Sequence, residues 1–146
     1  MVCTFFGHRD TPQEIVGTLR TVLAYLIEEK EAVEFYVGNQ GGFDSMVCRV
    51  LTELQERYPH IRYTVVLAYM PQKEEDVPQG VQPIYPSEIA QYPRRFAIEA
   101  RNKWMIEQAE YVVTYTLRVG GAAKMEVFAR RRGKMVINLA REDALQ

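Results

Sequence analysis

The sequence predicts an α/β fold: a single Rossmann-like three-layer domain with about five mainly parallel strands flanked by helices. Short apolar runs rich in β-prone residues alternate along the chain with longer amphipathic segments of helical periodicity. This alternation is typical of a parallel sheet with right-handed crossovers. Three of the apolar runs also end in glycine-bearing turns, a common arrangement at ligand sites. The 146 residues suit one domain spanning residues 1–146, because no linker or repeat divides them.

The first strand and the first helix carry clear signals. Residues 2–6 are apolar without polar alternation, as expected of a strand that is buried on both faces. Thr11, Pro12 and Glu14 predict a helix start, with Thr11 as the N-cap and Pro12 at the first helical position. An apolar stripe with helical spacing follows, made of Ile15, Val16, Leu19, Val22, Leu23, Leu26 and Ile27.

Residues 33–37 and 63–69 predict the second and third strands. The helix between them stops at Tyr58–Pro59, because a residue that precedes proline is disfavoured in the helical region. Its apolar face comprises Met46, Val47, Val50, Leu51 and Leu54. The resulting β-α-β-α-β order implies that these three strands are parallel.

Residues 70–95 interrupt this rhythm. They contain five of the seven prolines and an acidic cluster at 74–76. A connection of this length in a small domain is either a lid or binding loop, or a surface excursion, and the sequence leaves both alternatives open. Residues 87–91 predict a short helical turn within it. We interpret the acidic cluster as a solvent-exposed surface, and no metal site is predicted there.

The last part of the chain predicts a helix at residues 96–108, a strand at 111–115, a helix at 122–132 and a strand at 135–139. Arg101 falls on the apolar stripe of the first of these helices. A buried guanidinium without a partner is unfavourable, so we expect an anionic partner from the protein or from a ligand. Gly133 is predicted to be the C-cap of the second helix.

Composition narrows the classes of partner. The 19 acidic and 18 basic residues nearly cancel, which disfavours nucleic acid as a partner. Cys3 and Cys48 lie in apolar segments without metal-ligand spacing, as in proteins of reducing compartments. No apolar run reaches membrane-spanning length and no signal-peptide pattern is present, so the sequence predicts a cytoplasmic protein without membrane contact. Homo-oligomerisation through helix faces stays open.

The candidate site lies where three predicted strands end, at residues 7–10, 38–44 and 114–121. In an open parallel sheet, ligands bind outside the carboxyl ends of the strands, near the point where the strand order reverses. If the first, second and fourth strands are neighbours, the three loops converge there, and their glycines let backbone N–H groups approach a phosphate. The expected ligand-binding residues are Gly7, His8, Arg9, Gly38, Gly41, Gly42, Asp44, Arg101, Asn102, Gly120 and Gly121.

Two of these residues have alternative roles. His8 could act as a general base, but an imidazole in a tight turn more often bonds to the backbone, and we favour that interpretation. Asp44 could be a helix N-cap or a ligand of ribose hydroxyls. The first loop lacks the Gly-x-Gly-x-x-Gly fingerprint, so NAD-dependent hydride transfer is disfavoured.

Four motifs in order carry a family resemblance: TFFGHR at 4–9, GGFD at 41–44, RNKWM at 101–105 and the glycine pair at 120–121. Together they resemble the SLOG superfamily, and within it the small bacterial YpsA-like proteins of unknown function. The resemblance covers nearly the whole chain. It implies a Rossmann-like domain related to DprA and to the LOG phosphoribohydrolases, and a nucleotide or nucleotide-derived ligand.

The resemblance to the LOG enzymes is partial. Arg101, Met105 and Glu110 match the first part of the LOG pattern, and the glycine pair matches the second part. Val127, however, stands where the catalytic glutamate belongs. Glu126 is one residue early, a rotation of about 100° on a helix. If the chain is an enzyme, Arg101 and Glu126 are the catalytic candidates that the resemblance implies.

These observations predict a domain that binds a nucleotide or nucleotide-derived ligand, with its phosphate on the glycine loops, as a sensor would. The resemblance implies two alternatives: a LOG-like phosphoribohydrolase acting on nucleoside 5'-monophosphates, and DprA-like binding of single-stranded DNA. The second alternative is weaker, because that mode relies on a basic groove and the net charge is −1. No cofactor other than the nucleotide-type ligand is expected.

Overall fold

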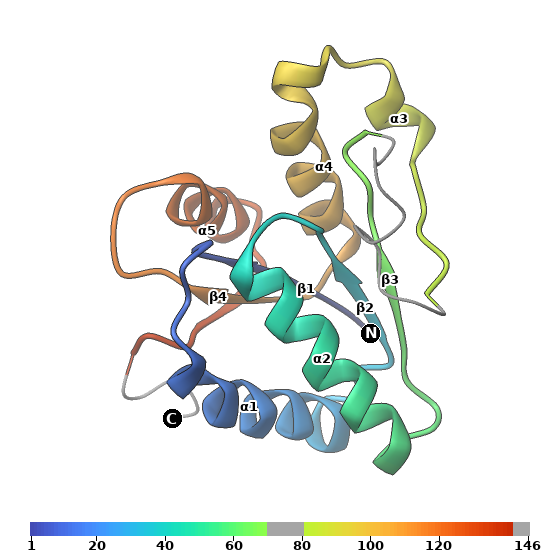
Figure 1. Ribbon diagram of the computed structural model, residues 1–146, viewed down its shortest axis with the longest axis vertical. Helices are drawn as coiled ribbons and strands as arrows, with labels where there is room; N and C mark the ends of the chain where they lie inside the picture. The colour runs from blue at the N-terminus through green and yellow to red at the C-terminus, as the bar shows by residue number, and fades with distance from the viewer. Residues whose placement is uncertain (70–80, 142–146) are drawn as a thin grey trace.

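A five-stranded, entirely parallel sheet forms the centre of the molecule. The computed structural model describes residues 1–69 and 81–141. The strands are β1 (Val2–Gly7), β2 (Glu34–Val37), β3 (Arg62–Val65), β4 (Tyr111–Tyr115) and β5 (Met135–Asn138). Their spatial order is β3-β2-β1-β4-β5. Helices cover both faces of this sheet (Figure 1), so the predicted Rossmann-like α/β domain is confirmed.

One face of the sheet is covered by α1 (Val16–Glu29) and α2 (Gly42–Arg57). The stripe predicted for the first helix supplies the buried residues of α1, from Leu19 to Ile27. The predicted N-cap is wrong. The Thr11 hydroxyl donates to the His8 carbonyl at 2.6 Å and so closes the turn after β1. The helix begins instead with a 3-10 turn at Gln13–Ile15.

The opposite face is covered by α4 (Arg94–Gln108) and α5 (Gly121–Arg131), with the short helix α3 (Ser87–Ala90) preceding them. Both long helices match their predicted positions to within two residues. Gly133 has a φ of +76°. The amides of Gly133 and Lys134 bond to the carbonyls of Arg130 and Ala129, the Schellman pattern. Gly133 therefore ends the helix as predicted, but one residue beyond the C-cap, which is Arg132.

The third strand is shorter than predicted. β3 ends at Val65, after which Val66 forms an isolated parallel bridge with Ile84. The chain therefore returns along this edge within the predicted excursion of residues 70–95. Residues 70–80 of that excursion lie outside the described residues, and so does the acidic cluster at 74–76. Among the described helices, none is long and apolar enough to cross a membrane.

The topology places the carboxyl ends of three strands together. β1 pairs with β2 on one side and with β4 on the other, and Gly7 lies opposite Tyr115 at the end of the β1–β4 ladder. The direction of winding reverses between β1 and β4, which makes this pair the topological switch point. The three glycine-bearing loops therefore meet at one edge, as the sequence predicts.

Candidate functional site

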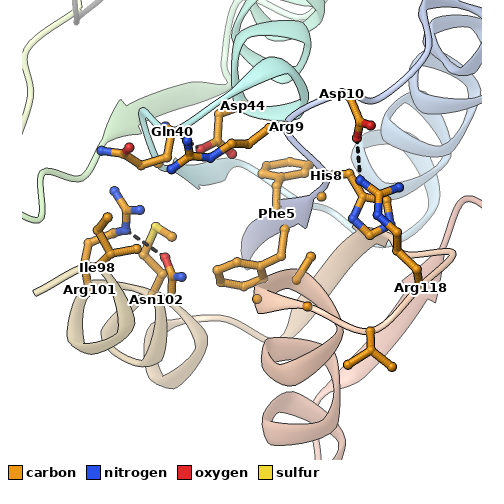
Figure 2. A pocket seen from close by; sticks show the side chains of 18 residues that line it. Phe5, His8, Arg9, Asp10, Gln40, Asp44, Ile98, Arg101, Asn102 and Arg118 are labelled. Carbon is orange, nitrogen blue, oxygen red and sulfur yellow. Dashed lines mark hydrogen bonds and ion pairs between the residues drawn. The ribbon is translucent and has the colours of Figure 1, made fainter. Parts of the chain in front are cut away.

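A cavity of about 600 Å³ lies at this edge, outside the ends of β1, β2 and β4 (Figure 2). The loops after these strands line it together with α4 and the start of α5. Every predicted ligand-binding residue except Gly41 and Gly42 contributes to its wall. The lining residues are Phe5, Phe6, Gly7, His8, Arg9, Asp10, Gly38, Gln40, Asp44, Ile98, Arg101, Asn102, Met105, Arg118, Val119, Gly120, Gly121 and Ala122.

Gly41 and Gly42 serve packing rather than the cavity wall. The Gly42 amide, one of those expected to face a phosphate, donates to the Arg9 carbonyl at 2.9 Å. A Cβ on Gly42 would lie 2.4 Å from that oxygen, far inside van der Waals contact. Gly41 has a φ of +95°, which disfavours any residue with a side chain. The pair lets the start of α2 lie directly against the loop after β1.

Arg101 is buried, as its place on the apolar stripe predicts, and only 2% of its surface is exposed. Its Nη1 donates to the Val66 carbonyl at 3.0 Å and to Asn39 Oδ1 at 3.3 Å, and its Nε donates to Asn102 Oδ1 at 2.8 Å. Within residues 1–69 and 81–141, Nη2 has no acceptor. The guanidinium is thus held on two nitrogens, while the third is available to the cavity that Arg101 lines.

Asp44 lies in the first turn of α2 and is 9% exposed. Its Oδ2 accepts a hydrogen bond from the Gln40 amide at 2.9 Å. The N-cap position belongs to Gly41, so the N-cap alternative for Asp44 is wrong. Burial raises the pKa of Asp44 to about 6, although the Gln40 amide and the nearby Arg101 guanidinium act in the opposite direction. Asp44 Oδ1 accepts no hydrogen bond in the described part of the chain.

Gly38, at the end of β2, makes room for both charged groups. A Cβ on Gly38 would lie 2.9 Å from Asp44 Oδ2 and 3.0 Å from Arg101 Cζ. Burial lowers the pKa of Arg101, and the neighbouring Asp44 carboxylate opposes that change. The glycine that the sequence marks as a strand end therefore lets the carboxylate and the guanidinium approach the same point.

His8 connects two of the three loops. Its Nε2 accepts a hydrogen bond from the Leu117 amide at 2.9 Å, so the backbone-bonded alternative is the one that the structure shows. Because a backbone amide can only donate, Nε2 is unprotonated and the neutral ring carries its proton on Nδ1. Burial lowers the pKa of His8, and the Arg118 guanidinium lowers it further, while Asp10 raises it.

A second contact joins the same two loops: Arg118 donates to Asp10 at 2.7 Å, drawn as a dashed line in Figure 2. Arg118 is not among the residues that the sequence predicts at the site, although a cation two residues before a glycine pair could have suggested it. The same holds for the apolar part of the wall, which includes Phe6, Ile98 and Met105. The periodicity of their strand and helix indicates burial, but not that they border a cavity.

Gly120 and Gly121 stand at the start of α5, with Gly120 in the N-cap position. Within the described residues no side chain caps this helix, so its first amides face outward without a protein acceptor. A Cβ built on either glycine would have no heavy atom of the described chain within 4 Å. Internal packing therefore does not require glycine here, and the space beside the backbone is open to a ligand.

Glu126 does not line the cavity. Its Oε1 accepts a hydrogen bond from the Thr114 hydroxyl at 2.6 Å and a longer one from Thr116 at 3.4 Å. These bonds attach α5 to the end of β4. The residue that the LOG resemblance implies as a catalytic candidate is thus engaged between a helix and the sheet.

No protein-family model matches this chain, and no curated protein matches it in sequence. Within residues 1–69 and 81–141, no group of three His, Cys, Asp or Glu side chains is placed to hold a metal ion.

Proposed function

We propose that this chain binds a nucleotide or nucleotide-derived ligand in the cavity, with a phosphate at the first amides of α5. The observation that carries the proposal is the open N-terminus of α5 at Gly120–Gly121, which borders the cavity at the switch point. Unpaired amides and the helix dipole together favour an anion at such a terminus.

The size and composition of the cavity support the same proposal. About 600 Å³ lies within the range of small-molecule sites. Phe6, Ile98 and Met105 give the wall an apolar part that suits a planar base. Three arginines and two aspartates line the cavity, which leaves an excess of one positive charge when all five are ionised. An anion with an apolar portion matches this combination.

The phosphoribohydrolase alternative gains no support from the site. It requires a carboxylate that reaches the glycosidic bond, whereas Glu126 is bonded to Thr114 and is absent from the cavity wall. Single-stranded DNA binding gains none either, because such proteins use a strongly basic groove.

A matched pair of variants tests the proposal. Gly121→Ala adds a methyl group at the start of α5 without meeting the protein, and Gly17→Ala adds one near the start of α1, again with nothing within 4 Å. Both substitutions should leave the fold intact and raise stability by no more than about 0.5 kcal/mol, since both glycines lie in the first turn, where alanine is favoured less than in a helix interior. Only the first should obstruct a ligand.

The assay is thermal-shift screening followed by titration calorimetry with AMP, ADP, cyclic AMP and ADP-ribose. A ligand at a hundred times its dissociation constant should add about 2.7 kcal/mol to the unfolding free energy. We expect Gly121→Ala to weaken the best ligand at least about tenfold, which is roughly 1.4 kcal/mol, while Gly17→Ala binds like the parent. Absence of any shift with the whole panel, or unchanged affinity in Gly121→Ala, would overturn the proposal.

A further inference from the structure

The end of the cavity next to β2 presents one acceptor and one donor, both on buried side chains. Asp44 comes from α2 and Arg101 from α4 (Figure 2). Asp44 Oδ1 accepts no hydrogen bond and Arg101 Nη2 donates none within residues 1–69 and 81–141. Both residues line the cavity. In the described part of the chain no enclosed side-chain nitrogen or oxygen lacks a hydrogen-bond partner, so Oδ1 and Nη2 are open to solvent or to a ligand in the cavity. A ligand that bonds to both atoms would complete the pair.

The two side chains are held apart rather than joined. No nitrogen of Arg101 lies within 4.0 Å of a carboxylate oxygen in the described residues, although both groups crowd the same face of Gly38. Asp44 is fixed by the Gln40 amide at 2.9 Å. The Val66 carbonyl at 3.0 Å and Asn102 at 2.8 Å fix the guanidinium. Neither group can turn toward the other without breaking these bonds.

A carboxylate and a guanidinium side by side select against a full charge of either sign. An anion at this end would be attracted by Arg101 but repelled by Asp44, and a cation would be attracted by Asp44 but repelled by Arg101. A neutral group with two neighbouring hydroxyls can bind both side chains, because a hydroxyl can donate and accept a hydrogen bond. One hydroxyl would donate to Asp44 Oδ1, and the other would accept from Arg101 Nη2.

We infer that Asp44 and Arg101 bind the vicinal diol of a ribose, which makes the ligand a ribonucleotide rather than a 2'-deoxyribonucleotide. The inference rests on the proposed function and assigns the orientation of the ligand. The diol lies at the end of β2 and the phosphate lies at α5, beyond the end of β4. Because β1 separates these strands, the two subsites are about 10 Å apart, twice the spacing of neighbouring strands.

This orientation changes the role that the sequence gives to Arg101. The arginine recognises the sugar, so the phosphate depends on the amides of α5 and on the cations of the other loops. Asp44 supplies a pH signature as well. Burial raises the pKa of Asp44 to about 6, so its carboxylate becomes protonated below that pH. The protonated group no longer accepts hydrogen bonds as an anion from both the ligand hydroxyl and the Gln40 amide. Preference for the diol should therefore weaken as the pH falls from 7.5 to 5.

Titration calorimetry with four probes tests the inference: AMP, 2'-deoxy-AMP, 3'-deoxy-AMP and ribose 5-phosphate. We expect removal of either hydroxyl to weaken binding about tenfold to a hundredfold, because it leaves Asp44 or Arg101 without its hydrogen-bond partner. Ribose 5-phosphate carries the diol and the phosphate without a base, so it tests whether the ligand is a nucleotide or a free sugar phosphate. It should bind at least tenfold more weakly than AMP.

Asp44→Asn is the matching variant. Its amide oxygen can still accept from the Gln40 amide, while its NH2 group turns a donor toward the diol. The ratio of AMP to 2'-deoxy-AMP affinity should fall to within about threefold of unity. Glu53→Gln, which removes a carboxylate from an exposed ion pair with Arg20, is the control and should keep the parent ratio.

The outcomes separate this inference from the proposed function. Equal affinity of the parent protein for AMP and both deoxy forms would overturn the inference and leave nucleotide binding standing. Failure of every nucleotide in the panel to bind would overturn both. Ribose 5-phosphate binding as tightly as AMP would support the diol contact but overturn the assignment to a nucleotide. An unchanged ratio in Asp44→Asn would remove Asp44 from the contact.

Discussion

Replacing His8 with leucine should loosen the loop that leads into α5, whereas replacing it with glutamine should not. The parent imidazole holds this loop by accepting the Leu117 amide at 2.9 Å, across 109 positions of sequence. A glutamine carbonyl can reach the position of Nε2 and accept the same hydrogen bond, but it does not titrate. Leucine fills similar space and offers no acceptor.

The magnitude follows from the surroundings of that hydrogen bond. Leu117 is itself exposed, so water can reach its freed amide in part. The loss should therefore be near the ordinary net value for a neutral hydrogen bond, about 1 kcal/mol. That corresponds to a fall of about 2–4 °C in Tm for a chain of this size. The neighbouring Arg118–Asp10 pair is exposed and should compensate little.

The pH dependence has a definite sign. The pKa of His8 is lower in the folded protein than the usual 6.5, chiefly because of burial and then because of Arg118. Between the two pKa values the unfolded chain binds more protons, so this contribution is present above pH 6.5 and is lost as the pH falls below it. Asp44 acts in the opposite sense, because its pKa is raised. Comparison of the parent with His8→Gln isolates the histidine, since Asp44 is common to both.

Urea unfolding at pH 8.0, 6.5 and 5.5 checks this reasoning. We expect the parent and His8→Gln to be similar at pH 8.0 and the parent to lose stability relative to His8→Gln at pH 5.5. His8→Leu should be the least stable of the three at pH 8.0. Equal stability of the leucine and glutamine variants at pH 8.0 would refute the role of the hydrogen bond. A parallel pH response of parent and His8→Gln would refute the role of titration.

Two further predictions concern packing beside the cavity. Gly42→Ala should lose about 1–3 kcal/mol in urea unfolding, because its methyl group would lie 2.4 Å from the backbone oxygen of Arg9; a change under about 0.5 kcal/mol would contradict this. Glu126→Ala should lose about 1–3 kcal/mol because the buried Thr114 hydroxyl is left without its acceptor, whereas Glu126→Gln retains an oxygen and should lose less. Equal melting temperatures of the two Glu126 variants would count against that role.

Much of the fold is predictable because its signals are local. The apolar run of β4 and the stripe of α1 specify burial within a few residues of themselves, and both elements match the structure. Thr11 shows where local reasoning fails. Its hydroxyl could bond either to a helix amide or to the His8 carbonyl, and in the structure it donates to the His8 carbonyl in the turn after β1. The end of β3 at Val65 was also missed, because the next residue, Val66, pairs with Ile84, a distant residue within the excursion.

The candidate site is predictable in position but not in detail. Parallel topology alone brings the glycine loops together, and Arg101 on an apolar stripe signals an inward charge. The roles of individual groups depend on contacts between distant segments. The Gly42 amide is occupied by Arg9, and the Leu117 amide by His8. The spacing of residues in one sequence does not predict these hydrogen bonds, because each of them joins two loops that are distant along the chain.

The strand order also has a consequence for how this chain acquires its site. β1 pairs with β2 and, through the later half of the chain, with β4, so one side of the central strand can be completed early and the other only late. Closing so long a loop is slow, since its entropy must be lost before the β1–β4 contacts compensate. A nascent chain ending before Tyr111 would hold Gly38, Asp44 and Arg101 but lack β4 and the amides at the start of α5. The proposed site can therefore be complete only after β4 has paired with β1 and α5 has docked, which is a late step of folding.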